Sequence, residues 1–189
     1  MEIYESGMIF SFQDGIEAVK YDDHPFYSQH YNHIDGGKGV DILAAGDSSV
    51  LFIEVKNCTG TAENQDKWRR QYSGTKNMDT LASEIAGKVA HTCACLTGAA
   101  TYGERNKTGQ ELMPYLSHQN ISQIASLKKK LYVLLYLEGD FSCFTRPNKT
   151  IYGEIRKRIA KRLDWLNCKV DVVSTETQKL PSVAARIQE

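Results

Sequence analysis

Residues 38–57, KGVDILAAGDSSVLFIEVKN, constrain the fold of this 189-residue chain more than any other stretch. Two runs rich in apolar and β-branched residues, 40–45 and 50–56, flank a polar loop at 46–49. Such runs, bounded by Gly, Asp and Ser, are typical of a β-hairpin. Because alternate side chains of a strand point to opposite faces, we expect the second run to have one apolar face and one face that carries its charges.

The register of this hairpin brings two carboxylates together. If Ala45 pairs with Val50 across the loop, Asp41 stands directly opposite Glu54. Cross-strand neighbours have Cβ atoms about 5 Å apart, and like charges placed there are destabilising. A hard divalent cation such as Mg²⁺, which binds carboxylate oxygens, is the simplest reason to keep such a pair. Lys56 shares the strand face of Glu54, where its ammonium can hold a water or stabilise a developing negative charge.

A metal-free pair has a further consequence, which concerns protonation. Like charge and burial both favour the neutral form of a carboxyl group. We therefore expect the Asp41–Glu54 pair to titrate with one apparent pKa above the usual carboxyl range. A surface hairpin whose charges merely face water is the alternative interpretation.

The spacing of these charges resembles the core motif of a nuclease superfamily. An Asp at position 41, twelve residues, and Glu-x-Lys at 54–56 are similar to the PD-(D/E)xK motif, with Val40 in the place of its proline. Residues 14–57 resemble a little-characterised bacterial branch of that superfamily, and the rest of the chain follows it as an order of elements. The resemblance implies a restriction-endonuclease-like fold and a Mg²⁺-dependent hydrolase acting on phosphodiester bonds, with Mn²⁺ as a substitute metal.

The resemblance also gives roles to the motif residues. Asp41 and Glu54 would bind the metal together with the backbone carbonyl of Val55. Lys56 would orient or deprotonate the attacking water and offset charge in the transition state. The sequence contains no Gly-rich phosphate loop and no GxSxG elbow that would support a different chemistry.

A further acidic residue is expected from the segment before the hairpin. Residues 14–21 are predicted to form a helix, with Ile16 and Val19 on its apolar side. In the superfamily, a helix at this place often brings another carboxylate to the metal site. Glu17 is the matching residue, with Asp22 and Asp23 in reserve. A solvated helix glutamate is the alternative.

Nucleic-acid binding would need a local basic surface, because 23 basic and 23 acidic side chains leave no net charge. Basic clusters at residues 67–76 and 156–162 are candidates, and a solvated helix face is the alternative for each. The candidate nucleic-acid-binding residues are Asn57, Arg69, Arg70, Lys157 and Lys161. DNA is favoured over RNA as the partner, and a homodimer stays open as the assembly.

The whole chain, residues 1–189, is predicted to form a single α/β domain. Helices are expected at 79–98 and 150–167, strands at 131–137 and 169–173, a less regular insertion around 99–128, an extended or loop-like start at 2–12, and a short amphipathic tail at 183–188. The order helix, hairpin, helix, strand, helix, strand predicts a three-layer sandwich around a mixed central sheet, with helices on both sheet faces.

The cysteines and the hydropathy of the sequence limit the cellular compartments in which we expect the protein. The five cysteines form no Cys-x-x-Cys pair and no even framework, which favours reduced thiols. No apolar run approaches membrane-spanning length, and the N-terminal residues do not resemble a signal peptide. We therefore expect a cytoplasmic protein without a membrane partner. The main rival to a nuclease is a catalytically silent domain of the same fold that binds nucleic acid or a protein. A metal-binding phosphoesterase for small nucleotides is a third alternative.

Overall fold

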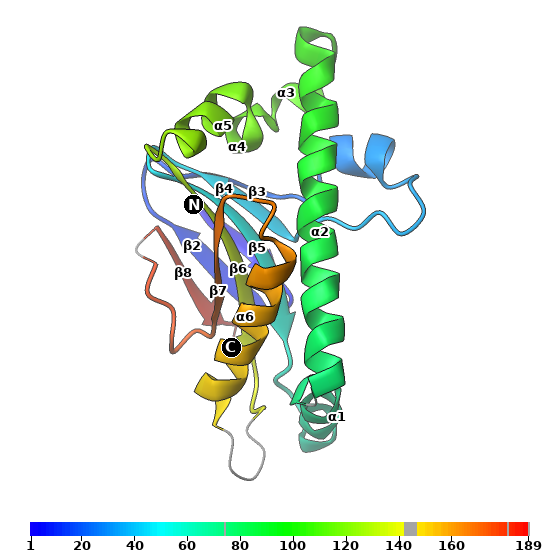
Figure 1. Ribbon diagram of the computed structural model, residues 1–189, viewed down its shortest axis with the longest axis vertical. Coiled ribbons are helices and arrows are strands. Elements are labelled where there is room, and N and C mark those ends of the chain that lie inside the picture. Colours follow the sequence, from blue (N-terminus) through cyan, green and yellow to red (C-terminus); the bar gives the residue numbers. More distant parts are fainter. Residues whose placement is uncertain (74, 142–146, 181, 189) are drawn as a thin grey trace.

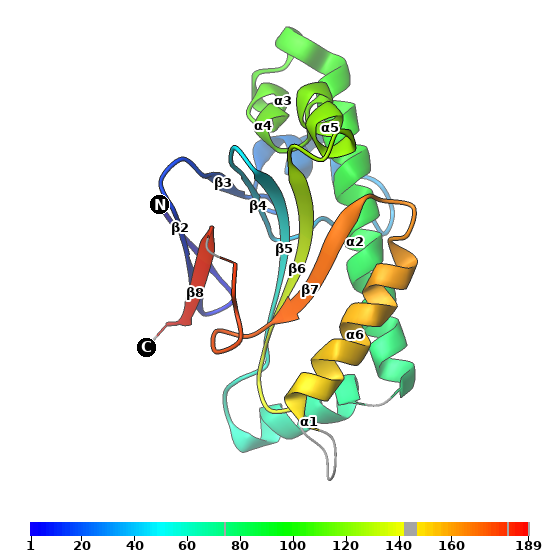
Figure 2. The same ribbon diagram turned by 60° about the vertical axis from the view of Figure 1, so that its left-hand side comes forward.

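A five-stranded sheet separates a layer of helices from a smaller, three-stranded sheet in the computed structural model of the protein (Figure 1). The structure describes residues 1–73, 75–141, 147–180 and 182–188, with the side chains of 64, 69, 71–73 and 75 left out. Turning the molecule shows the three layers side by side, with the small sheet on one flank and the long helices on the other (Figure 2). The chain is therefore a mixed α/β protein.

The central sheet is mixed, as the sequence predicts. Its strands, in spatial order, are β3 (Glu17–Lys20), β4 (Ile42–Ala45), β5 (Ser49–Asn57), β6 (Lys130–Glu138) and β7 (Cys168–Val173). β4 pairs antiparallel with both β3 and β5. β6 pairs parallel with both β5 and β7. A parallel strand needs a crossover connection, and the helices between β5 and β7 supply it.

The hairpin register agrees with the sequence prediction. Ala45 pairs with Val50, and the pairing runs regularly to Ile42 and Ile53, where the ladder ends. Asp41 lies just beyond it, and its amide nitrogen donates a 3.0 Å hydrogen bond to the carbonyl oxygen of the same Ile53, so Asp41 sits beside Glu54 without forming a regular ladder pair with it. The two carboxylates thus lie on the same face of the hairpin.

The helix layer is built from α1 (Ala62–Ser73), α2 (Thr75–Tyr102) and α6 (Asn148–Arg162). α2 lies along the sheet beside α6, and its apolar stripe at Leu81, Ile85 and Val89 is fully buried. At 1.5 Å per residue, its 28 residues span about 42 Å, which is longer than any strand of the sheet. The helices predicted at 79–98 and 150–167 are both present, but α2 extends further at both ends, and α6 begins two residues earlier and ends five residues earlier than predicted.

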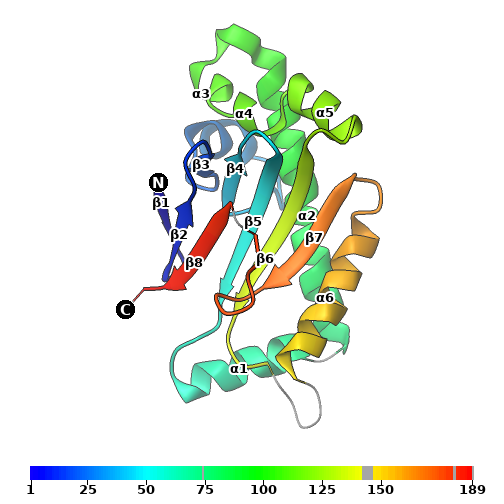
Figure 3. The same ribbon diagram turned by 90° about the vertical axis from the view of Figure 1, so that its left-hand side faces the viewer.

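The predicted less regular insertion is a group of short helices at one end of the sheet. Its elements are η2 (Gly103–Arg105), α3 (Lys107–Gln110), α4 (Met113–Leu116) and α5 (His118–Ala125). They lie beside the loop that joins β4 to β5, as Figure 3 shows. The segment before the hairpin adds a short π-helix, η1 (Tyr27–Tyr31), which packs under α2 through Tyr27.

The second face of the central sheet is covered by strands, which corrects the prediction of helices on both faces. β1 (Glu2–Glu5), β2 (Met8–Phe12) and β8 (Val183–Ile187) form an antiparallel sheet in the order β1-β2-β8. Its Phe10 packs at 4.9 Å, edge to face, against Tyr136 of β6. β1 and β2 form a local hairpin across a two-residue turn, and β8 joins them from the other end of the chain. These segments are short, so their pairing decides that they become strands.

The predicted helix over residues 14–21 is wrong. Residues 17–20 form β3, which pairs antiparallel with β4 and closes one edge of the central sheet. Gly15 has a φ of +81°, a conformation that breaks a helix at its first turn. A helix of eight residues is marginal alone, so pairing with the exposed edge of β4 decides the conformation.

Candidate functional site

Asp41 and Glu54 form the centre of the candidate site, on the face of the hairpin that α2 covers. Both are buried, with exposed fractions of 8% and 1%. Oδ2 of Asp41 accepts a 2.7 Å hydrogen bond from the amide nitrogen of Val55. Oε2 of Glu54 is buried and has no hydrogen-bond partner in the described part of the chain. One oxygen of the pair is therefore fixed by the backbone, and another is left unsatisfied.

An ammonium group from α2 lies between the two carboxylates. Nζ of Lys88 is 2.6 Å from Oε1 of Glu54 and 3.2 Å from Oδ1 of Asp41. The sequence predicts a divalent cation at this place to relieve the repulsion between the carboxylates. In the structure, the Lys88 side chain supplies positive charge there.

Lys56 is held on the same side of the site by two carboxylates. Its Nζ lies 3.2 Å from Oε1 of Glu54 and 2.9 Å from Oε1 of Glu84. Glu84 precedes Lys88 by four residues, so the two side chains leave α2 on the same face, one turn apart. The site is thus a network of alternating charges, in which Lys88 bridges the motif carboxylates and Glu84 anchors the motif lysine.

The protonation of the network follows from its burial. Burial, reinforced by the charge of Asp41, raises the pKa of Glu54 to about 7, although Lys88 and Lys56 both oppose the rise. Burial also raises the pKa of Asp41 above its ordinary value, against the effect of Lys88. Burial lowers the pKa of each lysine, but the carboxylates around it together outweigh this effect, Glu54 and Asp41 for Lys88 and Glu54 and Glu84 for Lys56, so both pKa values lie above the ordinary lysine value. A pair that holds a proton above the usual carboxyl range is what the hairpin register predicts.

The backbone around Asp41 is fixed from three sides. Its amide nitrogen bonds to β5, and its carbonyl oxygen accepts a 2.8 Å hydrogen bond from the amide of Tyr21. The preceding residue, Val40, donates a 3.1 Å hydrogen bond to the hydroxyl of Thr92, which itself donates to the carbonyl oxygen of Lys88 at 2.8 Å. α2 and the first strand of the hairpin are therefore joined directly at the site.

The acidic residues before the hairpin lie in two different places. Glu17 pairs with Ala45 beside the hairpin loop, at the opposite end of β4 from Asp41, so the structure does not bring it to the carboxylate pair. Asp22 is half-buried two residues beyond the end of β3, and burial, followed by the charges of Glu5 and Asp41, raises its pKa to about 6. Its Oδ1 is buried without a hydrogen-bond partner among the described residues.

Asp23, the other alternative to Glu17 as a third metal ligand, faces solvent. Its carboxylate lies 3.0 Å from Nζ of Lys20, which also reaches Oε2 of Glu5 at 3.1 Å. Among the described residues, no group of three or more His, Cys, Asp or Glu side chains is arranged to hold a metal ion. The ligand set that the structure offers is therefore the carboxylate pair itself.

Asn57 caps the end of β5. Its Oδ1 accepts hydrogen bonds from the amide nitrogen and hydroxyl of Thr59, at 3.1 and 2.6 Å. Its Nδ2 donates to the carbonyl oxygen of Ser6 in the β1–β2 turn at 2.8 Å. All three contacts are internal, so this side chain ties the strand end to the small sheet.

The first basic cluster lies on α1. Arg70 is exposed there, and its Nε donates a 3.2 Å hydrogen bond to the carbonyl oxygen of Asp66 one turn earlier. The side chain of Arg69 lies outside the residues that the structure describes. Of this predicted cluster, Arg70 is thus seen on a solvated helix face.

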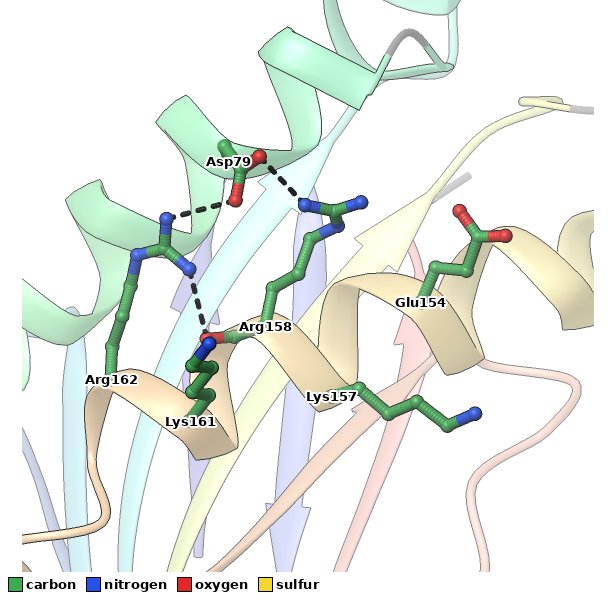
Figure 4. A pocket seen from close by; sticks show the side chains of 6 residues that line it. All are labelled: Asp79, Glu154, Lys157, Arg158, Lys161 and Arg162. Atoms are coloured by element: carbon green, nitrogen blue, oxygen red, sulfur yellow. Dashed lines mark hydrogen bonds and ion pairs between the residues drawn. The ribbon is translucent and has the colours of Figure 1, made fainter.

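The second basic cluster lines an open groove between α2 and α6 (Figure 4). Asp79 of α2 holds two arginines of α6, since its carboxylate lies 2.6 Å from Nη1 of Arg158 and 2.9 Å from Nη2 of Arg162. Lys157 points away from Asp79, and both Lys157 and Lys161 are exposed. The arginines therefore join the two helices, while the lysines face solvent.

Sequence reasoning missed Lys88, Glu84 and Thr92, which complete the site. Their spacing of four residues places them on one face of a helix. Glu84 and Lys88 each precede by one residue a member of the apolar stripe of α2, Ile85 and Val89, so this face borders the one that packs on the sheet. Two charges beside a buried stripe, in the helix that follows a carboxylate hairpin, are the signal that was available.

The chain belongs to DUF6661, a family of unknown function, which it matches over residues 24–187. No curated protein and no solved structure gives a match. The matched region includes the hairpin, α2 and α6, and thus every charged group of the Lys88 network. Within the described residues, no helix is both long and apolar enough to cross a bilayer.

Proposed function

We propose that this protein is a metal-dependent nuclease of the PD-(D/E)xK type, with a restriction-endonuclease-like core and DNA favoured over RNA as substrate. The observation that carries the proposal is the close approach of the Asp41 and Glu54 carboxylates, which share the Lys88 ammonium, with Lys56 3.2 Å from Glu54. Buried like charges that face each other are costly, and they recur in proteins where a site uses them. The hairpin has this arrangement although its other side chains are almost all apolar.

The donor atoms of the pair suit a hard divalent cation. Mg²⁺ keeps several waters and is commonly bound by one or two carboxylates. Oδ1 of Asp41 and the unsatisfied Oε2 of Glu54 are free of backbone partners, and these carboxylates would hold the ion, with the Val55 carbonyl as a further ligand from the family resemblance. The ion would supply Lewis-acid stabilisation of the phosphoryl oxygens.

Lys56 then acts as a cation. Its pKa lies above the ordinary lysine value because of the charges of Glu54 and Glu84, so it is protonated at neutral pH. A protonated lysine cannot take a proton from water, but it can orient the attacking water and stabilise charge on the transition state. Glu84, at 2.9 Å, holds the ammonium in position for this role.

A catalytically silent domain of the same fold, which binds nucleic acid or a protein, is the second candidate. The specific observation that favours it is the Lys88 ammonium, which lies where a metal would neutralise the carboxylates. In such a domain, the network would serve stability alone.

A cleavage panel decides between the two functions. Purified protein is incubated with single- and double-stranded DNA and RNA, in Mg²⁺, in Mn²⁺ and in EDTA. We expect cleavage of at least one substrate that requires the metal, and loss of this activity in Asp41→Asn. If the protein binds the metal but cuts none of the substrates, it is a catalytically silent binding domain.

A further inference from the structure

We infer that Lys88 is a tethered cation that occupies the metal position, and that a divalent ion binds to the carboxylate pair by displacing it. The inference rests on the proposed function, because it concerns the metal of that site. It is carried by the two contacts of the Lys88 ammonium, 2.6 Å to Glu54 and 3.2 Å to Asp41. One side chain thus reaches both members of a pair that the hairpin register brings together.

The ammonium and a metal ion compete for the same atoms. Lys88 contacts Oε1 of Glu54 and Oδ1 of Asp41, while the other oxygen of Asp41 is already bonded to the Val55 amide. A Mg²⁺ ion that used Oδ1 of Asp41 would stand within a few ångströms of the ammonium, with no water layer to screen the repulsion. One of the two cations must therefore leave.

Lys88, and not Lys56, is the one that leaves. Lys56 is held by Glu84, which is no part of the motif pair, so it keeps a carboxylate partner when a metal binds Glu54. Both hydrogen bonds of the Lys88 ammonium go to the motif carboxylates, and a metal would take both partners. The Lys88 side chain is 12% exposed, so its stem already reaches the edge of the site.

The network therefore explains how the carboxylates stay buried without a metal. The side chain of Glu54 is 1% exposed and that of Asp41 is 11% exposed. Removing one partner of a buried ion pair is strongly destabilising, because it leaves uncompensated charge. Lys88 should thus stabilise the metal-free protein and oppose metal binding. These two effects of one side chain have opposite signs.

The test compares the wild type with Lys88→Met and, as the matched control, Lys56→Met. Mn²⁺ affinity is measured by calorimetry, and melting temperatures are measured in EDTA and in Mg²⁺. We expect Lys88→Met to melt lower in EDTA, to gain more from Mg²⁺, and to bind Mn²⁺ at least about tenfold more tightly than the wild type. Lys56→Met should change Mn²⁺ affinity much less. Equal or weaker Mn²⁺ binding by Lys88→Met overturns the inference.

A second measurement needs no variant and covers the case in which Lys88→Met does not fold. An amine-reactive label is applied to the wild type, and modification of each lysine is followed by mass spectrometry. We expect Lys88 to be protected in EDTA and labelled several-fold faster in Mg²⁺, whereas Lys56 stays protected in both. Equal labelling of Lys88 with and without Mg²⁺ would show that the metal does not displace it.

These readouts separate the inference from the nuclease proposal. Tighter metal binding by Lys88→Met, in a protein that cuts no substrate, supports displacement and removes the nuclease function. Metal-dependent cleavage by the wild type, with unchanged metal affinity in Lys88→Met, supports the nuclease and removes displacement. If Lys88→Met loses cleavage while its metal affinity stays the same, Lys88 acts in the reaction itself and the inference is wrong.

Discussion

The amide nitrogen of Val55 donates a 2.7 Å hydrogen bond to Oδ2 of Asp41, from the strand that also carries Glu54. This bond fixes the plane of the Asp41 carboxylate by a backbone group, which cannot rotate away as a side chain could. Its second oxygen is thereby aimed at the ammonium of Lys88. The geometry of the pair is thus a property of the hairpin, and the helix supplies only the countercharge.

The metal-free protein should lose stability as the pH rises from about 4.5 to about 7. The pKa of Glu54 is raised from 4.5 to about 7 in the folded state, so the folded state holds this proton more tightly than the unfolded state does. By linkage, stability is highest below the unfolded value and falls until the folded value is passed, by an amount on the order of 3 kcal/mol. Urea denaturation in EDTA across this range measures the fall.

Glu54→Gln is the variant that isolates this effect. It keeps an oxygen that can accept from Lys88 and removes the titrating group, so its stability should change less with pH between these values. Glu104→Gln, at an exposed position beyond the end of α2, should follow the wild type. A Glu54→Gln profile that matches the wild type would assign the pH dependence to another group.

Lys56→Ala should reduce metal-dependent cleavage by about 10² to 10⁴, the usual contribution of a positioned proton-transfer or charge-stabilising group. Mn²⁺ affinity should change little, because a protonated lysine is no metal ligand. Initial rates at saturating metal, compared with Lys149→Ala on the exposed start of α6, measure the loss. Cleavage at the wild-type rate would show that Lys56 has no part in the reaction.

Changing both Lys157 and Lys161 to Gln should weaken DNA binding if the groove between α2 and α6 contacts phosphates. Each lost phosphate contact makes the plot of log affinity against log salt concentration less steep, by about one unit of slope. The double variant Lys128→Gln, Lys130→Gln, at exposed positions at the start of β6, is the matched control. Equal slopes in the two double variants would mean that the groove is only a solvated surface.

Asp79→Asn should have the opposite effect on DNA binding. The carboxylate of Asp79 holds Arg158 and Arg162, and the arginines in turn keep its pKa below the ordinary value. Its loss frees two guanidinium groups for phosphate, so DNA affinity at low salt should rise several-fold and depend more steeply on salt. Fluorescence anisotropy with labelled DNA at several salt concentrations measures both. Unchanged affinity would place DNA elsewhere on the protein.

Gly98→Ala should stabilise the protein by about 0.5–1 kcal/mol, because α2 is helical there and glycine loses more chain entropy than alanine on folding. A methyl group at this position would meet no atom within 4 Å. Gly139→Ala is the contrasting variant, since Gly139 has a φ of +136° and its added carbon would lie 3.2 Å from the Cys58 carbonyl oxygen. Thermal melts should shift in opposite directions, and a destabilised Gly98→Ala would contradict the prediction.

The carboxylate pair could be predicted from the sequence because every step to it is local. The period of two in a strand and a four-residue loop are enough to bring both carboxylates to one face of the hairpin, just beyond the Ile42–Ile53 pair. Lys88 could not be predicted in the same way. Its place depends on how α2 packs across the hairpin, which no local rule fixes. The sequence therefore led to a metal as the countercharge, when a lysine from a helix lies there.

The edge strand β3 and the small sheet could not be predicted for a related reason. Four-residue segments such as 2–5 and 17–20 carry little intrinsic preference, and their conformation is decided by the partner that they find. The local pattern predicts a helix over 14–21 and the family resemblance places Glu17 at the metal, whereas pairing with β4 carries Glu17 to the hairpin loop. Long periodic segments such as α2 and β6 do not depend on a partner to this degree, and both were predicted.

The pairing of β2 with β8 sets an order on folding. Met8 pairs with Ile187, so the small sheet cannot close until residues 183–187 have been synthesised and have returned to the start of the chain. The hairpin can form in microseconds from neighbouring residues, but this long-range closure is slow, because the entropy of a large loop must be lost first. The turn between β1 and β2 is tied to Asn57 at the end of the motif strand. A growing chain will therefore present the carboxylate hairpin and α2 long before the opposite face of the central sheet is covered.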